Sequence, residues 1–178
     1  MSLALTMSVC AHGLAEEHSL IMIGPRTGIS GSSPLLGKEQ KYNFRLYDIA
    51  ALWRLPWHWP IGETGWRFET RLITSAGAIA GGGDTGFVAT VVPDLALTGW
   101  NGRVILDAGL GAGLFPTYKF GAQSFGGPVQ IVGTVGIGVN VMSHGYAGLR
   151  LQHFSDATLY GSSSLGADMY ILELAYRF

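Results

Sequence analysis

The feature that most constrains the fold is a period of two in the uncharged residues 129–141. Every second residue there is apolar and, apart from Gly133, β-branched: Val129, Ile131, Val135, Ile137, Val139 and Val141. The residues between them include small and polar ones: Gln130, Thr134, Gly136, Gly138 and Asn140. Because successive side chains of a strand point to opposite faces, we expect a strand whose two faces meet different surroundings.

The same alternation recurs along the chain, with turn signals between the runs. The expected strands lie near residues 18–26, 41–55, 66–72, 87–98, 104–115, 129–141, 146–156 and 168–178. The expected turns lie at residues 56–65, 81–84, 99–102, 117–127, 143–145 and 157–166. Eight strands of about ten residues, joined alternately by short and long connections, are typical of the smallest outer-membrane barrels. The predicted fold is therefore all-β, an eight-stranded antiparallel transmembrane β-barrel.

The composition favours this barrel over the alternative of a soluble β-sandwich or lipocalin-like barrel. Of 178 residues, 27 are glycine, and 48% are hydrophobic but only 13% charged. A soluble barrel would bury its apolar face and expose a charged one. Here the polar face holds many glycines and few Lys or Glu residues, as a cramped barrel interior requires. The five tryptophans gather near two connections, which is typical of a membrane interface: Trp53, Trp57, Trp59, Trp66 and Trp100.

Strict alternation creates one conflict, at Asp48. It places Asp48 on the predicted lipid face with Phe44, Leu46 and Leu52, so we expect a bulge nearby or a position close to the headgroups.

The connectivity also predicts an orientation. With both termini in the periplasm, the connections near residues 27–40, 81–85, 116–127 and 157–167 are extracellular, and the tryptophan-rich turns are periplasmic.

The N-terminal residues 1–15 are predicted to be a signal peptide, cleaved after Ala15, and residues 16–178 the single barrel domain. A disordered N-terminus is the alternative. The single Cys10 cannot form an intrachain disulfide. Eleven basic and twelve acidic residues, without a Lys/Arg cluster, give no sign of a nucleic-acid partner.

Candidate catalytic residues lie at the end of the seventh strand and the start of the eighth. His153 and Ser155 share the parity of the apolar residues before them, and Asp168 shares the parity of the apolar face of the last strand. These three side chains are therefore expected to meet on the outside of the barrel at its extracellular rim. Serine, histidine and aspartate are the residue types of nucleophilic acyl transfer. A polar strand end near the headgroups is the alternative explanation.

The segment His153-Phe154-Ser155-Asp156-Ala157, followed by a glycine-containing loop and by an acid about a dozen residues after the serine, resembles the PagL-type lipid A 3-O-deacylases. The resemblance implies an eight-stranded outer-membrane enzyme with His153 as base, Ser155 as nucleophile and Asp168 as the acid that orients the histidine. Two residues depart from the family pattern. Asp168 stands where the family has a glutamate, and Asp156 stands where it usually has an asparagine implicated in stabilising the oxyanion.

A carboxylate next to a developing negative charge is harmful, so the backbone N–H of Asp156 or Ala157 is the expected oxyanion donor. The substrate implied is lipopolysaccharide, from whose lipid A an ester-linked 3-hydroxyacyl chain is removed in the outer membrane of a Gram-negative bacterium. The predicted acyl-chain contacts are Leu149, Leu151 and Leu172. This chemistry requires neither a metal nor a cofactor.

Three further points stay open at the level of sequence. A non-catalytic barrel that acts as a scaffold, adhesion surface or envelope stabiliser is the competing functional class. A small pore is disfavoured, because side chains fill the interior of an eight-stranded barrel. A homodimer is kept as an alternative to a monomer.

Overall fold

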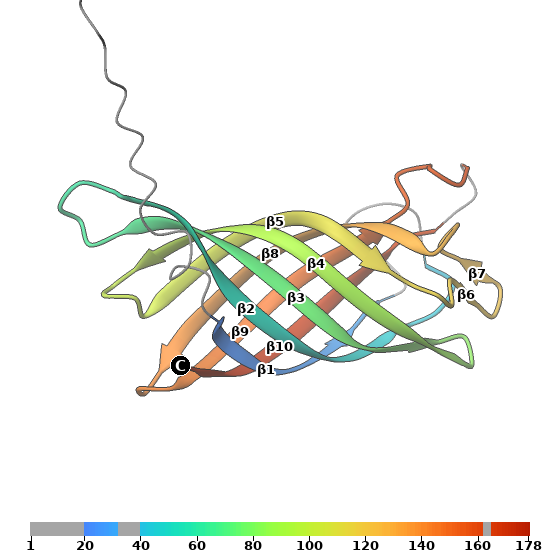
Figure 1. Cartoon of the computed structure of the whole chain (residues 1–178). Helices are drawn as coiled ribbons and strands as arrows, with labels where there is room; N and C mark the ends of the chain where they lie inside the picture. Colours follow the sequence, from blue (N-terminus) through green and yellow to red (C-terminus); the bar gives the residue numbers. More distant parts are fainter. Residues whose placement is uncertain (1–19, 32–39, 162–164) are drawn as a thin grey trace, which may run out of the picture.

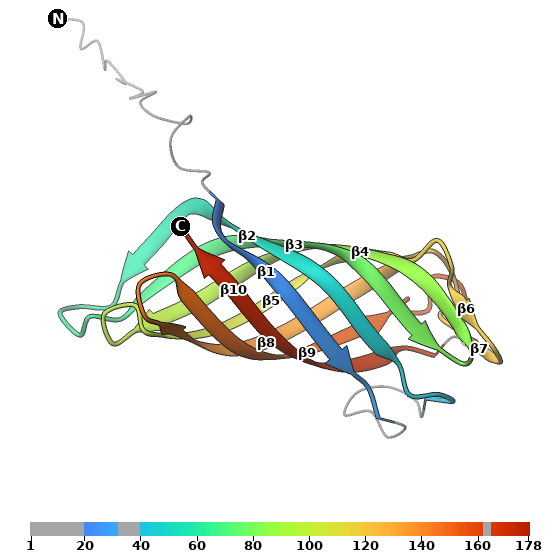
Figure 2. The same cartoon turned by 90° about the horizontal axis from the view of Figure 1, so that it is seen from below.

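In this computed structural model, residues 20–31, 40–161 and 165–178 are described. In these residues eight long antiparallel strands close into a barrel, in the order β1-β10-β9-β8-β5-β4-β3-β2 (Figures 1 and 2). Pairing of β1 with β10 closes the ring, so the barrel has no free strand edge. The predicted fold class is confirmed. The long strands are β1 Leu20–Ile29, β2 Arg45–Pro60, β3 Arg67–Gly81, β4 Asp84–Gly99, β5 Val104–Leu114, β8 Val129–Val141, β9 Gly145–Ser155 and β10 Ala167–Arg177.

Some element boundaries differ from the prediction. The connection expected to be a plain turn at 117–127 contains a small hairpin of β6 Lys119–Phe120 and β7 Gln123–Ser124. Strand β2 continues to Pro60 through a register irregularity between Arg54 and His58, so the turn begins five residues later than expected. The hairpin pairs two neighbouring segments of one connection, and the added residues of β2 pair with β3, the next strand along the chain. The signal peptide and cleavage site predicted at residues 1–15 lie outside the described residues.

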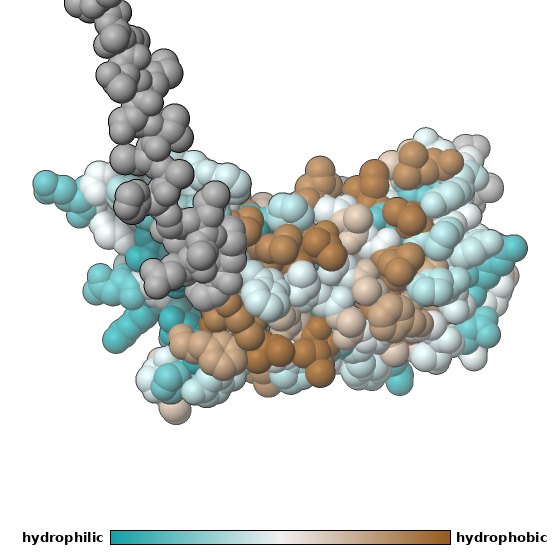
Figure 3. Space-filling view, in the orientation of Figure 1, coloured by the Kyte–Doolittle hydropathy of each residue, from teal (hydrophilic) through white to brown (hydrophobic). Residues whose placement is uncertain are grey.

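The outer surface of the barrel is apolar around its middle. Figure 3 shows hydrophobic residues gathered over the central part of the visible face and hydrophilic residues at both ends. Large exposed side chains of this belt include Ile49, Leu110, Val135, Leu149 and Leu172. Exposure of a continuous apolar belt to water is unfavourable, whereas the hydrocarbon of a bilayer solvates it. In the described residues, no helix is long and apolar enough to cross a membrane.

The barrel has two different ends. At one, which we call the turn end, short connections join β2 to β3, β4 to β5 and β8 to β9; at the other, the loop end, lie the two-residue turn from β3 to β4, the connections from β1 to β2 and from β9 to β10, and the β6–β7 hairpin between β5 and β8 (Figure 1). Trp57, Trp59 and Trp100 are more than half exposed at the turn end, and Trp66 packs against Trp100 at 6.0 Å between ring centroids. This clustering agrees with an aromatic belt at one interface. The assignment of the turn end to the periplasm stays a prediction.

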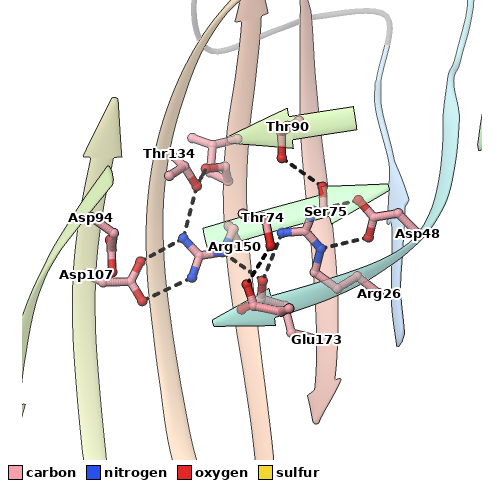
Figure 4. A network of polar contacts seen from close by, with 12 residues as sticks. Arg26, Asp48, Thr74, Ser75, Thr90, Asp94, Asp107, Thr134, Arg150 and Glu173 are labelled. Carbon is pink, nitrogen blue, oxygen red and sulfur yellow. Dashed lines mark hydrogen bonds and ion pairs between the residues drawn. The ribbon is translucent and has the colours of Figure 1, made fainter. Parts of the chain in front are cut away.

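The interior of the barrel holds a chain of charged side chains (Figure 4). Arg26 binds Asp48 through two hydrogen bonds of 2.6 and 2.8 Å and approaches Glu173 at 3.4 Å. Arg150 binds Glu173 at 2.8 Å and, on its other side, Asp107 at 2.7 and 3.0 Å. The network continues from Asp107 to Arg71 and from there to Asp94. Each of these buried charges thus has an oppositely charged partner, which buried charges require.

Asp48 therefore lies inside the barrel, and the predicted lipid face of its strand was wrong. Leu46, Asp48 and Leu52 are buried in the interior, whereas Tyr47 and Ile49 point outward. No bulge is needed at Asp48, because its carboxylate neutralises Arg26, its direct cross-strand partner on β1. Both faces of β2 carry apolar residues, so alternation alone did not distinguish lipid from core.

Five fully buried phenylalanines close the interior at the loop end: Phe44, Phe115, Phe120, Phe125 and Phe154. Their rings meet mostly edge to face with centroids 4.9 to 5.8 Å apart, a favourable aromatic geometry. Phe120 belongs to the β6–β7 hairpin, which explains why this connection folds over the barrel end. Ion pairs and aromatic rings together fill the interior and leave no room for a water-filled pore.

We predict that Arg150→Ala destabilises the barrel by about 3–5 kcal/mol, because it leaves the buried carboxylates of Asp107 and Glu173 without a shared cation. Arg150→Lys keeps the charge and should cost less. Arg67→Ala is a matched surface control, since Arg67 is half exposed and its pair with Glu69 should contribute less than about 1 kcal/mol. Tryptophan fluorescence during urea unfolding in lipid vesicles measures all three; equal stability of wild type and Arg150→Ala would contradict the prediction.

Candidate active site

The site begins with a cross-strand pair of side chains on the outside of the barrel. His153 on β9 and Asp168 on β10 are direct register partners, and Nδ1 of His153 lies 2.5 Å from Oδ1 of Asp168. Asp168 is fully buried, whereas about a fifth of the His153 side chain is exposed. A carboxylate can only accept this bond, so in a neutral ring Nδ1 carries the proton and Nε2 is left as an acceptor. In this arrangement Nε2 of His153 can accept a proton, as a general base must.

Ser155 lies two residues beyond His153 on the same face of β9 and is partly exposed. Two residues of a strand span about 6.6 Å between Cα atoms, so the side chains are neighbours on one surface. Its Oγ accepts a hydrogen bond from the backbone N–H of Ala157 at 3.1 Å. Within the described part of the chain, the hydroxyl is not hydrogen-bonded to His153. The structure therefore brings the three predicted residues to one patch and joins two of them directly.

The carboxylate of Asp156 is engaged in the turn that follows β9. Its oxygens accept the backbone N–H groups of Thr158 at 3.1 Å and Tyr160 at 3.4 Å, and the residue is buried. Asp156 directly follows Ser155, the last residue of β9. Its carboxylate thus supports the loop by accepting hydrogen bonds from the loop backbone.

Ala157 has the backbone conformation of a strained turn. Its φ is 48° and that of Thr158 is 67°, in the left-handed region that side chains disfavour. This conformation turns the Ala157 N–H back towards Ser155 Oγ. A donor aimed at the nucleophile is also close to the oxygen of an acyl group bonded to that nucleophile. Of the two predicted oxyanion donors, Ala157 is the one with this contact; the Asp156 N–H remains a prediction.

The predicted acyl contacts form an apolar surface adjoining the pair. Leu149 and Leu172 are register partners on β9 and β10 and are 62% and 46% exposed, which places them in the lipid-facing belt. Leu151 is partly buried on the same face. Their contact with a substrate stays a prediction.

Sequence reasoning missed the segment that covers the histidine. A Cβ at Gly166 would clash with the Phe154 carbonyl and would lie 3.3 Å from Cε1 of His153, so only glycine lets the chain pass this close. Gln123 and Ser124 of β7 hold this segment: Gln123 donates to the Gly166 carbonyl at 3.3 Å and the Leu165 N–H donates to the Ser124 carbonyl at 2.9 Å. The hairpin thereby positions the chain beside the pair. Because contacts with residues distant in sequence, such as that of the Lys41 N–H with Gln123, hold the hairpin in place, the local sequence carried no signal for this role.

Across residues 20–31, 40–161 and 165–178, no group of three or more His, Cys, Asp or Glu side chains is arranged to hold a metal ion.

We predict that Asp156→Ala loosens the turn at residues 156–161, because two backbone N–H groups lose a charged acceptor. Hydrogen bonds to charged groups contribute about 1.5–3 kcal/mol, so amide exchange at Thr158 and Tyr160 should accelerate about tenfold or more. Asp156→Asn keeps one acceptor and should retain much of the protection. Amide exchange followed by NMR in detergent micelles measures this; unchanged protection in Asp156→Ala would contradict the assigned role.

The chain is similar to known proteins in sequence and in fold. A family model described as "Lipid A 3-O-deacylase (PagL)" matches residues 45–177, three quarters of the chain and all of the candidate site. A solved structure described as "Crystal structure of the outer membrane enzyme PagL" is similar with a TM-score of 0.70 at 18% identity, and the match covers 88% of this chain and 99% of that chain. No curated protein matches the chain. The barrel is thus an integral outer-membrane protein, and the chain belongs to the PagL lipid A 3-O-deacylase family.

Proposed function

We propose that this outer-membrane lipid A deacylase hydrolyses the ester of the 3-hydroxyacyl chain at position 3 of lipid A, with Ser155 as nucleophile, His153 as base and Asp168 as the orienting acid. The observation that carries the proposal is the 2.5 Å contact between His153 and the buried Asp168 on the lipid-facing side of the barrel, with Ser155 on the same face. A soluble hydrolase has no reason to place such a pair in an apolar belt.

In the first step, His153 Nε2 accepts the proton of the Ser155 hydroxyl while Oγ bonds to the ester carbonyl carbon. The Asp168 carboxylate stabilises the imidazolium that forms. The carbonyl oxygen becomes an oxyanion, and the Ala157 N–H, which binds Oγ at 3.1 Å in the resting site, is in position to donate to it.

The tetrahedral intermediate then breaks the bond between the acyl carbon and the lipid A oxygen. The imidazolium of His153 returns its proton to that oxygen, so the sugar leaves as an alcohol and the acyl chain stays bonded to Ser155. A water molecule, deprotonated by the same Nε2, repeats the sequence on the acyl-enzyme. A free 3-hydroxy fatty acid and the original serine result.

The resting hydroxyl must rotate from Ala157 towards His153 for the first step. Rotation about one side-chain bond of a partly exposed serine is fast, and catalytic hydrogen bonds often tighten only when substrate is bound. The hydrogen bond from the Ala157 N–H to Ser155 Oγ therefore belongs to the resting state. When substrate binds, its carbonyl oxygen can accept the same N–H instead.

The place of the site on the barrel accounts for the substrate class. With both termini periplasmic, the loop end is extracellular, and His153, Ser155 and Asp168 lie at the level where lipid A carries its ester bonds. Leu149, Leu151 and Leu172 adjoin the site and contact the acyl chains of lipid A. The substrate thus approaches laterally in the membrane, and its chains need not enter water, where exposing each methylene costs about 0.8 kcal/mol.

We predict that Ser155→Ala and His153→Ala each lower release of 3-hydroxy fatty acid by at least about 10³-fold and that Asp168→Asn lowers it by about 10²–10⁴-fold, because the base then loses its tautomer and its counter-charge. The assay is mass spectrometry of purified lipopolysaccharide incubated with the folded barrel. Ser143→Ala, an exposed serine in the turn between β8 and β9, is the matched control and should retain full activity. Undiminished release by Ser155→Ala would exclude the proposed nucleophile.

The position of cleavage has its own test. Lipid A that lacks the position-3 acyl chain but keeps its other ester-linked chains should give no released fatty acid with the wild-type barrel. Release from this substrate would show that the enzyme cleaves a different ester.

A further inference from the structure

Gly133 is the only interruption in the β-branched, lipid-facing stripe of β8, and it lies beside the candidate site. Its register partner on β9 is His153, and its partner on β5 is Leu110. The outward neighbours on its own strand, Ile131 and Val135, are 37% and 52% exposed. Gly133 is thus a notch in an apolar wall, one strand away from the histidine.

Packing and backbone geometry account for the other glycines whose surroundings the structure describes, but not for Gly133. A Cβ at the neighbouring Gly136 would meet Asp107 and Arg150 at 2.7 and 2.9 Å, and one at Gly138 would clash with Tyr146. The described glycines with open space around them, Gly133 apart, have a positive φ. At Gly133 a Cβ would find no atom within 4 Å, and φ is not positive. A β-branched residue would fit the strand, so the notch is not required by the fold.

The strand register shows what passes over this notch. Following register partners from Ser155 through β8, β5, β4, β3, β2, β1 and β10 returns to β9 at Gly145, ten residues closer to the turn end. Ten residues are about 33 Å along a strand, and eight strand spacings are about 38 Å, so the strands tilt by about 40° from the barrel axis. A line drawn from Ser155 towards the turn end, parallel to the barrel axis, therefore crosses β8 and then β5 and moves away from β10.

The same tilt gives the positions that the line crosses. Each step to the next strand advances about 5.5 Å, somewhat less than two residues, towards the turn end. From Ile131, the partner of Ser155, the line reaches Gly133; from Leu110, the partner of Gly133, it reaches Ala108. There it meets a surface hollow of about 590 Å³ that spans β2, β3, β4 and β5, where Trp57, Thr70, Leu95 and Ala108 contribute to the lining. An acyl chain anchored at Ser155 and parallel to the barrel axis thus passes over Gly133 and towards this hollow.

We infer that Gly133 seats the acyl chain of the scissile ester a few carbons beyond its carbonyl group, and that the hollow over β2 to β5 receives the rest. This inference rests on the proposed function and adds a specificity-determining residue to it. Ile131 and Leu110 flank the notch and hold the chain in line with Ser155. A side chain at position 133 would fill the notch next to His153 and lift the chain, and with it the carbonyl carbon, away from the nucleophile.

The second lipid-facing hollow supplies a matched comparison. It has a volume of about 480 Å³ and lies over β1, β2, β3 and β10, where Tyr47, Ile49, Ala76 and Leu172 contribute to its lining. An acyl chain that ran over β10 instead would use this hollow. Ala76→Val narrows it at an exposed, lipid-facing position, as Gly133→Val narrows the notch.

The experiment compares Gly133→Ala, Gly133→Val and Ala76→Val on two substrates, lipopolysaccharide and a short-chain aryl ester such as p-nitrophenyl butyrate. Gly133→Val should lower fatty-acid release from lipopolysaccharide about tenfold or more and Gly133→Ala by less, since one buried methylene in an apolar pocket changes discrimination about 10–200-fold. Hydrolysis of the short ester should be unchanged, because its chain ends before the notch. Ala76→Val should match wild type on both substrates.

The two substrates separate failure of the inference from failure of the function. If wild type releases fatty acid and Gly133→Val releases as much, or if Ala76→Val alone impairs release, the seat at Gly133 is excluded while the esterase stands. If wild type hydrolyses neither substrate, the proposed function falls and the inference with it. Equal loss on both substrates would indicate damage to the catalytic residues, which also excludes a role in chain selection. Heat-modified electrophoretic mobility verifies that each variant folds.

Discussion

The register between β9 and β10 is the constraint on which the rest of the molecule depends. A slip of one residue would turn every side chain of a strand to the opposite face. In the observed register Glu173 points inward between Arg26 and Arg150, and Asp168, on the same strand, points outward to His153. A slipped strand would expose Glu173 to lipid and leave two buried guanidinium groups without it. The interior ion pairs thus select the pairing that assembles the outer site.

The site also depends on the packing of the loop end, because contacts to the backbone join the two. The β6–β7 hairpin places Phe120 in the aromatic cluster and holds the chain at Leu165 and Gly166, which lies against His153. Residues far apart in sequence hold the hairpin in turn: the Lys41 N–H donates to the side chain of Gln123 at 2.9 Å. The residues that fill the barrel at its loop end and the segment that lies against His153 therefore pack together as one unit.

Alternation predicted most of this fold, and its failures have a physical cause. On β8 and β9 most outward residues are apolar and most inward ones are glycine, polar or charged, so parity identified both faces. On β10 Met169 and Ile171 also point inward, and Glu173 is the residue that marks the inner face. On β2 the interior is lined by Leu46 and Leu52 as well as Asp48, so an apolar face was mistaken for the lipid face. The two-residue strands of the hairpin were invisible for another reason, because contacts from elsewhere in the chain stabilise them.

The aspartate at position 168 illustrates how register and side-chain length compensate each other. Direct register partners in an antiparallel sheet have Cβ atoms about 4.5–5.5 Å apart. A carboxylate only one carbon beyond Cβ can then reach Nδ1 of the histidine across the strand, as Asp168 does at 2.5 Å. The resemblance to the PagL-type pattern implies a glutamate here, whose side chain is one methylene longer. Direct opposition to His153 across the strands compensates for the shorter reach of Asp168.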